Sequence, residues 1–461
     1  MQVANAAARL DRLPMGPFHW RVLRLISLGM FFDTFDNSMA AGILATLVHN
    51  GWSTLALNAH FISVTFLGLS VGALLAGVLG DRFGRRFAYQ FNLLIFGGMC
   101  LASAAAPTMG WLIAMRGLVG VGLGAEYVTG YSMVSEFVPP GRRGWALALV
   151  NLVSTSAGFV VSLVGFAVIP TIGWRAMFVI GGLGALWVWY LRKSLPESPR
   201  WLEQVGRVEE ADQLLRQIER ETGVLTPPAV IPTSPAPTPR AVPISVLFTR
   251  PVIRRTLLAI AVNVVCLVGA YSFTSWVPTF FVEQGMSVTK SLGFMTAMTL
   301  GNLAGPTIGM LVSDRIGRLR GLIVTALVCA AVGFVYPQLH SPLAIVPCGF
   351  VLISCMSLMI GFGLGAYTPE LFPTEYRFRG NGLGQMTGRM AVIASPYAVV
   401  ALYGLYGVGG AVGAIAILYL ALAIGLACFG LETNQLSLEA LAPEPEPSIL
   451  VDTARVDESG I

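Results

Sequence analysis

Long apolar runs separated by short polar connections dominate the chain of 461 residues. Most runs hold roughly twenty residues or more, and a helix of that length covers the ~30 Å hydrocarbon core of a bilayer at ~1.5 Å per residue. The pattern therefore predicts twelve membrane-spanning helices. They are expected at about residues 21–48, 59–80, 87–106, 110–135, 145–169, 174–192, 255–282, 289–312, 320–337, 342–366, 379–404 and 408–431.

The polar stretches outside these runs predict the domain organisation. Residues 206–221 carry charges at helical spacing and indicate a surface helix, whereas residues 227–243 are rich in proline and indicate an extended linker. An acidic tail with several prolines is typical of disorder. The expected units are a cytoplasmic lead at 1–20, a six-helix bundle at 21–195, a cytoplasmic loop at 196–250, a second six-helix bundle at 251–431 and a disordered cytoplasmic tail at 432–461.

Composition favours a membrane protein over a soluble one. Hydrophobic residues make up 55% of the chain and charged residues 11%, with a mean hydropathy of +0.72, whereas soluble domains contain roughly 25% charged residues. The net charge of +5 does not indicate nucleic-acid binding, because all Lys and Arg except Arg116, Arg175, Lys290 and Arg389 fall on one expected side of the membrane. The positive-inside rule makes that side, with both termini, cytoplasmic. Short loops and the predominance of Arg over Lys favour a bacterial inner membrane.

The two halves of the chain repeat three motifs at nearly the same offset. Asp81, Glu136 and Glu197 reappear 233, 234 and 235 residues later as Asp314, Glu370 and Glu432. A shared offset of this kind indicates duplication of a six-helix unit, which is a common origin of transporter folds. The motif pairs are GDRFGRR (80–86) with SDRIGRL (313–319), EFVPPGRRG (136–144) with ELFPTEYRFRG (370–380), and LPES (195–198) with GLET (430–433).

These motifs carry a family resemblance. GVLGDRFGRR (77–86) matches the G-x-x-x-D-R-x-G-R-R loop of the major facilitator superfamily, which the sequence resembles over essentially its whole membrane part. RGLVGVGLG (116–124) and PESPRWL (196–202) are similar to the sugar-porter and organic-ion branch. The resemblance implies an all-α membrane protein of twelve helices in two pseudo-symmetric bundles, which alternates access to a site near the midplane.

Helix 21–48 places Asp33 and Asp36 three residues apart near mid-membrane. Buried acids of this kind are either neutralised by helix contacts or bind protons, and an Arg that pairs and separates changes how tightly they hold a proton. In the sugar-porter pattern, which TFDNSMAAG (34–42) matches, the resemblance pairs Asp36 with Arg116 of helix 110–135 for proton coupling. Asp33 gives the D-x-x-D spacing, which is similar to the D-G-x-D of aromatic-acid:proton symporters.

Glu126 lies in the same helix as Arg116, about 15 Å further along and near its centre. A charge at that depth costs at least ~2.5–3.5 kcal/mol on insertion scales, so it normally faces a partner or water. Three roles are compatible with this position: substrate binding, proton relay, or pairing with a polar group of another helix.

Arg389 is the basic residue inside the second half of the membrane region, within GQMTGRMAVIASP (384–396). No acid of that half lies at an obvious matching depth, and the guanidinium fork binds both oxygens of a carboxylate. We therefore expect Arg389 to bind an anionic substrate, with an internal salt bridge as the alternative. An Arg in this context also resembles organic-anion members of the superfamily.

Further candidates for substrate contact come from aromatic and polar residues within the spans. The helix at 255–282 carries an aromatic stripe, which is either packing or ligand contact, and it lacks the paired glutamines, Asn and double Tyr of hexose porters. This difference favours a flatter, more apolar substrate than a sugar. The candidates are Tyr271, Trp276, Asn302, Tyr367 and Gln385, together with Glu126 and Arg389.

A set of charges at the cytoplasmic helix ends is repeated in both halves. The family resemblance implies that these charges form a gate, pairing when the cytoplasmic side closes and separating when it opens. Such a gate sets the conformational equilibrium without touching substrate. Its expected members are Asp81, Arg85, Glu136, Arg142 and Arg143 in the first half, and Asp314, Arg318, Glu370, Arg377 and Arg379 in the second.

The sequence offers little for other kinds of chemistry. Its six cysteines are scattered through apolar runs without C-x-x-C spacing, and its four histidines lie at helix ends or in loops. It contains no nucleotide-binding loop, metal cluster or nucleophile constellation, so we expect no cofactor, no metal and no enzymatic activity.

These observations predict a proton-coupled symporter that imports a small organic anion, such as an aromatic or other monocarboxylate. Its expected partners are the substrate, protons and the lipid bilayer, and it is expected to act as a monomer. The alternatives are a proton-coupled sugar or polyol porter and a transporter of organic cations or zwitterions, with Asp33 and Glu126 as counter-charges. A transport-inactive receptor on the same scaffold is disfavoured, because it has no need to retain costly buried charges.

Overall fold

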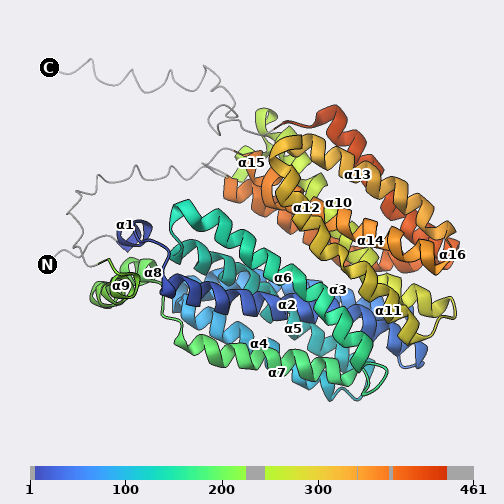
Figure 1. The fold of residues 1–461 in the computed structure, drawn as a ribbon, viewed down its shortest axis with the longest axis horizontal. Coiled ribbons are helices and arrows are strands. Elements are labelled where there is room, and N and C mark those ends of the chain that lie inside the picture. Colours follow the sequence, from blue (N-terminus) through green and yellow to red (C-terminus); the bar gives the residue numbers. More distant parts are fainter. Residues whose placement is uncertain (1–5, 225–243, 340, 373–376, 433–461) are drawn as a thin grey trace, which may run out of the picture.

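The computed structural model describes residues 6–224, 244–339, 341–372 and 377–432. Throughout these ranges the regular secondary structure is helical, and two bundles of long helices lie side by side (Figure 1). The linker predicted at 227–243 and all but the first residue of the tail predicted at 432–461 lie outside the described residues.

The N-terminal bundle contains six long helices. Each follows one apolar run of the sequence, because a backbone at membrane depth must satisfy its hydrogen bonds internally. The helices are α2 (Pro17–His49), α3 (Leu55–Phe83), α4 (Arg85–Ala104), α5 (Met109–Phe137), α6 (Pro140–Val168) and α7 (Arg175–Leu191), and the short η1 (Arg192–Ser194) follows α7.

The C-terminal bundle is built from the same kind of helices with more interruptions. The eighth span breaks at Leu300. Gly407 has a positive φ of 64° and separates the last two spans, both of which lie within α16. The elements are α10 (Arg250–Glu283), α11 (Val288–Thr299), α12 (Gly301–Ile316), α13 (Arg318–Val335), α14 (Pro342–Met359), η4 (Ile360–Tyr367), α15 (Thr368–Glu370) and α16 (Arg377–Phe429), with η2 (Ile244–Phe248) and η3 (Tyr336–Gln338) as short turns.

Within the described residues these elements form twelve membrane helices, and the predicted fold class is confirmed. Length and hydropathy alone identify 8 candidate spans there. One of the eight, Gly380–Phe429, contains two helices. Two more spans are missed because α7 is short and because the eighth span is divided into α11 and α12. Asp33 and Asp36 lower the mean hydropathy of α2, so composition understates this span as well.

Glycines bring α5 against α3 and so position the charged residues of α5. Gly120 lies against the backbone of Thr65, and Gly124 lies against the backbone of Leu69, with no room for a Cβ at either position. Close approach at small residues drives helix association where lipid removes the usual hydrophobic advantage. Arg116 and Glu126, which flank this contact, are therefore held on a helix that cannot easily shift.

Three short helices gather at one end of the bundles: α1 (Ala6–Asp11), α8 (Pro199–Gln204) and α9 (Val208–Thr222) (Figure 1). We call this the basic end, since the positive-inside rule predicts it to be cytoplasmic. The surface helix predicted at 206–221 corresponds to α9. Leu10 of α1 and Ile218 of α9 belong to one buried cluster with Phe137 at the end of α5.

Buried ion pairs hold α1 on α9. Arg9 is 4% exposed and donates hydrogen bonds to Glu219 at 2.6 and 2.9 Å and to Asp212 at 2.6 Å. Arg12 adds a hydrogen bond to Glu219 at 2.8 Å. Burial acts to raise the pKa of Glu219, but the hydrogen bonds from Arg9 and Arg12 outweigh it and keep the pKa below its ordinary value of 4.5.

The two bundles contact each other towards the opposite end. Ser63 of α3 donates a hydrogen bond to the carbonyl of Ile393 in α16 at 2.7 Å, and Thr296 of α11 donates one to the carbonyl of Ser162 in α6 at 3.0 Å. Ser63, Ser162 and Thr296 lie in the parts of their spans that are away from the basic end, and Ile393 lies near the middle of its span. These two hydrogen bonds therefore join the bundles away from the basic end.

The depressed pKa of Glu219 predicts that α1 docking is sensitive to acid. A carboxyl whose folded-state pKa is lowered contributes stability above its unfolded pKa and loses it as the pH falls through the folded value. Amide exchange of Ala6–Asp11 should therefore accelerate as the pH drops below about 4.5, after correction for the intrinsic pH dependence of exchange. Glu219→Gln should show the faster exchange already at neutral pH, and Glu210→Gln, in an exposed ion pair, should not. Equal protection of α1 in wild type and Glu219→Gln would contradict this role.

Candidate functional site

The first part of the site is a dry ion pair between α2 and α5. Arg116 Nη1 lies 2.6 Å from Asp36 Oδ2, and the two side chains are 1% and 0% exposed. Cys100 of α4 donates its thiol hydrogen to Asp36 Oδ1 at 3.3 Å, and the Arg116 guanidinium lies 5.1 Å from the Phe61 ring centroid. The structure thus brings together the two residues for which the resemblance implies proton coupling. Their role in coupling remains a prediction.

A second buried charge cluster lies nearer the basic end. Glu126 of α5 forms an ion pair with Arg192 of η1, and the side chains are 1% and 2% exposed. Arg192 also donates hydrogen bonds to the carbonyls of Leu25 and Ile26 in α2, at 2.9 and 3.1 Å. Of the roles compatible with the position of Glu126, the structure therefore shows pairing with another helix; substrate binding and proton relay stay predictions.

Asp33 lies beside this cluster without a hydrogen bond of its own. Its side chain is 1% exposed, and both carboxylate oxygens lack a hydrogen-bond partner among the described residues. The charged groups around it are Glu126, Arg192 and Asp36. Among these described groups, Arg192 is therefore the one cation close to two carboxylates, those of Asp33 and Glu126.

Arg389 lies half-buried in α16, between the two bundles. It lies close to Tyr271 of α10, whose side chain also lies near Asn37 of α2. The ring of Tyr271 packs edge-on against Phe66 of α3, with centroids 4.8 Å apart. Within the described residues, Arg389 has no ion-pair partner. Among the predicted substrate residues, the structure thus brings Arg389 and Tyr271 together.

The other predicted substrate residues are spread more widely. Gln385 lies one turn before Arg389 on α16 and is half-buried, so it belongs to the same region. Asn302 of α12 accepts a hydrogen bond from Ser357 at 2.8 Å and reaches towards Gly158 of α6. Trp276 is 2% exposed and stacks on Phe280, so its ring packs inside the protein.

Tyr367 does not join the group around Arg389. Its side chain is fully buried at the end of η4, where its hydroxyl accepts a hydrogen bond from the Leu431 amide at 3.2 Å. This position is at the basic end of the C-terminal bundle. Tyr367 therefore stabilises the link between η4 and the end of α16 in this conformation.

Repeated contacts occur at the predicted gate. Arg85 pairs with Glu136 at 3.2 Å in the N-terminal half, and Arg318 pairs with Glu370 at 3.6 Å in the C-terminal half. Arg142 is exposed. The side chains of the other predicted gate residues lie outside the described set; they are Asp81, Arg143, Asp314, Arg377 and Arg379.

Two further carboxylates cap the helices that begin at the gate. Glu197 accepts hydrogen bonds from the amides of Arg85 and Arg86 at 2.9 and 3.1 Å, at the start of α4. Glu432 accepts one from the amide of Arg318 at 3.1 Å, at the start of α13. A carboxylate at a helix N-terminus satisfies free amides and complements the helix dipole. Burial raises the pKa of Glu197, although its hydrogen bonds to backbone amides act in the opposite direction.

Comparison with known proteins identifies the family. The model of the Major Facilitator Superfamily matches residues 26–396. The chain belongs to the major facilitator superfamily. It is 36% identical to the inner membrane metabolite transport protein YdjE of Escherichia coli (strain K12), with 96% of this chain and 99% of that protein covered. It is 33% identical to the niacin transporter NiaP of Acinetobacter baylyi, with 95% and 99% covered.

Solved structures support the same fold. The inward open conformation of the xylose transporter XylE from E. coli superposes with a TM-score of 0.73 at 17% sequence identity, over 92% of this chain and 99% of that one. Membership of the superfamily makes this chain a multi-pass membrane transporter for a small molecule, and not an enzyme. Within the described residues, no three His, Cys, Asp or Glu side chains gather as metal ligands.

Sequence reasoning missed Arg192, Asn37 and Tyr127. Arg192 is the last residue of the predicted span 174–192 and is counted there among the cytoplasmic basic residues. Asn37 lies near Tyr271, and Tyr127 of α5 lies near Thr34 of α2. A polar residue one position from Asp36, and a Tyr one position from Glu126, were signals that could have found the last two.

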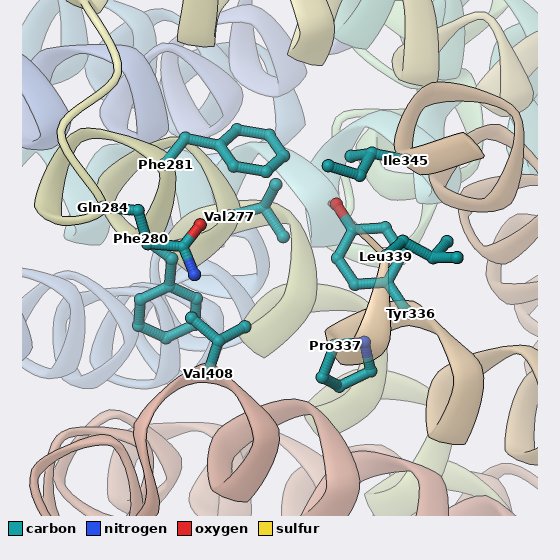
Figure 2. Close-up of a pocket in the computed structure, with 9 residues that line it drawn as sticks. All are labelled: Val277, Phe280, Phe281, Gln284, Tyr336, Pro337, Leu339, Ile345 and Val408. Carbon is teal, nitrogen blue, oxygen red and sulfur yellow. The ribbon is translucent and has the colours of Figure 1, made fainter. Parts of the chain in front are cut away.

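A separate pocket lies in the C-terminal bundle towards the opposite end. It is lined mainly by apolar side chains, among them Phe280, Phe281 and Ile345, with Gln284 and Tyr336 as polar groups (Figure 2). None of its lining residues is a predicted site residue. It is therefore distinct from the charged residues described above.

The burial of Asp36 and Arg116 predicts a stability effect that depends on both partners. Removal of one member leaves an uncompensated buried charge, which costs about 3–5 kcal/mol, whereas an apolar pair of similar volume is often neutral. Asp36→Leu or Arg116→Met alone should lower the thermal stability of the purified protein in detergent. The double variant should recover most of the loss. Substitution of both members of the exposed Arg207–Glu210 pair is the matched control and should have little effect. Additive losses in the double variant would show that the two charges do not neutralise each other.

Proposed function

We propose that this transporter imports a small aromatic monocarboxylate together with protons, by alternating access. The observation that carries the proposal is Arg389, a half-buried guanidinium within the membrane that pairs with no acid of the described residues. A charge at this depth is costly unless it has a partner. A carboxylate substrate supplies that partner.

The surroundings of Arg389 favour an aromatic acid over a sugar. Tyr271 and Phe66 form an edge-on pair beside it, and such rings pack well against a flat aromatic ligand. Gln385 and Asn37 add polar groups that fix orientation. The relative named as a niacin transporter supports the proposal, because niacin is a pyridine ring with one carboxylate.

Proton coupling is proposed for the N-terminal bundle, where Asp36 and Arg116 form the dry pair. Protonation of Asp36 removes the attraction between the two side chains and frees Arg116 to move. The contact between α2 and α5 at this pair then depends on whether Asp36 carries a proton. Since α2 also carries Asn37, which lies near Tyr271, a movement of α2 reaches the proposed substrate site.

The gate residues supply the proposed conformational switch. Arg85–Glu136 and Arg318–Glu370 are placed at the basic ends of the two bundles. Each pair is partly exposed, and an ion pair at a protein surface contributes only ~0–1 kcal/mol, but a set of such pairs that forms and breaks together can bias the equilibrium between two states. In this structure the bundles are bonded on the other side, as Ser63–Ile393 and Thr296–Ser162 show.

Uptake should depend on a pH gradient. In proteoliposomes, an inward proton gradient should drive accumulation of labelled niacin or benzoate above equilibrium, and labelled sugars and amines should not accumulate. Asp36→Asn should bind the acid yet lose the response to the gradient, because its neutral side chain cannot exchange a proton. Uptake that is the same with and without a gradient would remove proton coupling from the proposal. Accumulation of a sugar or an amine in place of the acids would contradict the proposed aromatic acid and indicate that other class of substrate.

Arg389 should determine carboxylate affinity. A hydrogen bond to a charged group contributes about 1.5–3 kcal/mol, so Arg389→Ala should weaken binding roughly 10- to 100-fold. Arg389→Lys should retain part of the affinity through its charge. The nicotinamide analogue of niacin has no carboxylate and should bind wild type and Arg389→Ala equally weakly. Arg207→Ala, which removes an exposed guanidinium, is the control, and isothermal titration of the detergent-solubilised protein gives the affinities. Unchanged niacin affinity in Arg389→Ala would exclude the receptor role.

A further inference from the structure

The buried charges of the N-terminal bundle do not balance. Asp36 and Arg116 form one complete pair. The second cluster holds the carboxyl groups of Asp33 and Glu126 but the single guanidinium of Arg192, and each of the three residues is 1% exposed. If both carboxyls were ionised, the cluster would carry one uncompensated negative charge inside the membrane. Such a charge is costly, and a buried acid is neutralised by a proton instead.

The contacts identify which carboxyl lacks a counter-ion. Glu126 is paired with Arg192. Asp33 has neither an ion pair nor a hydrogen bond on its carboxylate oxygens within the described residues. The groups that face it are Asp36 on α2, Glu126 and Tyr127 on α5, and Arg192 on η1. Among these, Arg192 is the cation, and Glu126 already engages it.

Arg192 is held in place by the backbone of α2. Its Nε and Nη2 donate to the carbonyls of Leu25 and Ile26, and its guanidinium occupies the space beside Gly29. A Cβ at Gly29 would collide with Arg192 Nη2 and lie 2.7 Å from Glu126 Oε1. The glycine therefore leaves room for one guanidinium between α2 and α5.

We propose that Asp33, Glu126 and Arg192 form a second proton-binding site, in which Arg192 neutralises Glu126 and a bound proton neutralises Asp33. Loss of that proton breaks the O–H bond of Asp33 and transfers the proton to water at the basic end. Both carboxylates then share Arg192, which moves away from its present position against Glu126. Arg192 acts as a positioning residue, since it determines which carboxyl carries the proton.

The chain after Arg192 leads directly to the gate. Tyr89 of α4 donates its hydroxyl hydrogen to the carbonyl of Leu195 at 3.0 Å. Two residues later, Glu197 caps the start of α4 at Arg85 and Arg86. Movement of Arg192 therefore displaces a short segment that is bonded to α4 beside the Arg85–Glu136 pair. This connection links the protonation of Asp33 to the gate.

The inference rests on the proposed proton coupling, and infrared difference spectroscopy tests it separately from transport. A protonated buried carboxyl has a C=O stretch that is absent from a carboxylate, and its band can be titrated with pH in the purified full-length protein. The charge count fixes the expected pattern. Asp33→Asn and Glu126→Gln should each lose the band, because one carboxyl then remains for one guanidinium. Arg192→Gln should give a band about twofold larger, because two carboxyls then lack a cation.

Two more variants separate this site from a structural role of the same residues. Asp36→Asn should keep the band, since Asp36 belongs to the other pair, and Arg192→Lys should keep it near wild-type size. Gly29→Ala should shift the pH midpoint of the band without any change in the number of charges. Correct folding of each variant is checked by circular dichroism and by size-exclusion chromatography.

Different results would overturn the proton-binding site and the proposed function. A wild-type protein with no titratable band would overturn the second site, as would a band that Asp33→Asn and Glu126→Gln leave intact or that disappears in Asp36→Asn. Uptake that ignores the pH gradient, with the band behaving as described, would instead overturn the proposed coupling and leave the proton-binding site in place.

Discussion

Neutrality of charge in a dry helix bundle is the constraint on which the N-terminal half depends. Asp36 with Arg116 and Glu126 with Arg192 are almost fully shielded from water. Without water the attraction between opposite charges is strong, and the cost of a lone charge is correspondingly high. Each of these side chains must therefore find a counter-charge or a proton, and the close glycine contacts of α5 with α3 keep the helices near enough to supply it.

The two halves share a frame but differ in the charges they carry inside the membrane. Both repeat the pairing of an Arg with a Glu at the basic end, and both cap the next helix with a distant carboxylate, Glu197 in one half and Glu432 in the other. Within the membrane, the acids lie in the N-terminal bundle and the half-buried Arg389 lies in the C-terminal one. Duplication thus accounts for the moving frame, and divergence accounts for the proposed separation of proton and anion sites.

A short backbone segment connects the buried charge cluster of the N-terminal bundle to the predicted gate at the basic end. From Arg192 to Glu197 the chain passes from a buried charge cluster to the first turn of α4. Since the segment is bonded at both ends, its position depends on the cluster and on the gate together. Nearby, α1 and α9 cover the same end of the bundle through Arg9 and Glu219. The buried charge cluster and the surface contacts are therefore separated by only a few residues of the chain.

The sequence alone indicated the fold class, the twelve spans and the motifs repeated at the basic end, because hydropathy and short motifs are properties of local segments. It also indicated Asp36 and Arg116 as partners, through a resemblance. Only the tertiary structure showed that Arg192 is buried while Lys193, its neighbour, is exposed. Successive helical residues point about 100° apart, so adjacent residues with the same charge can face a bundle interior or water. The depth and rotation of α7 against α2 decide between them, and these depend on packing that no local pattern contains.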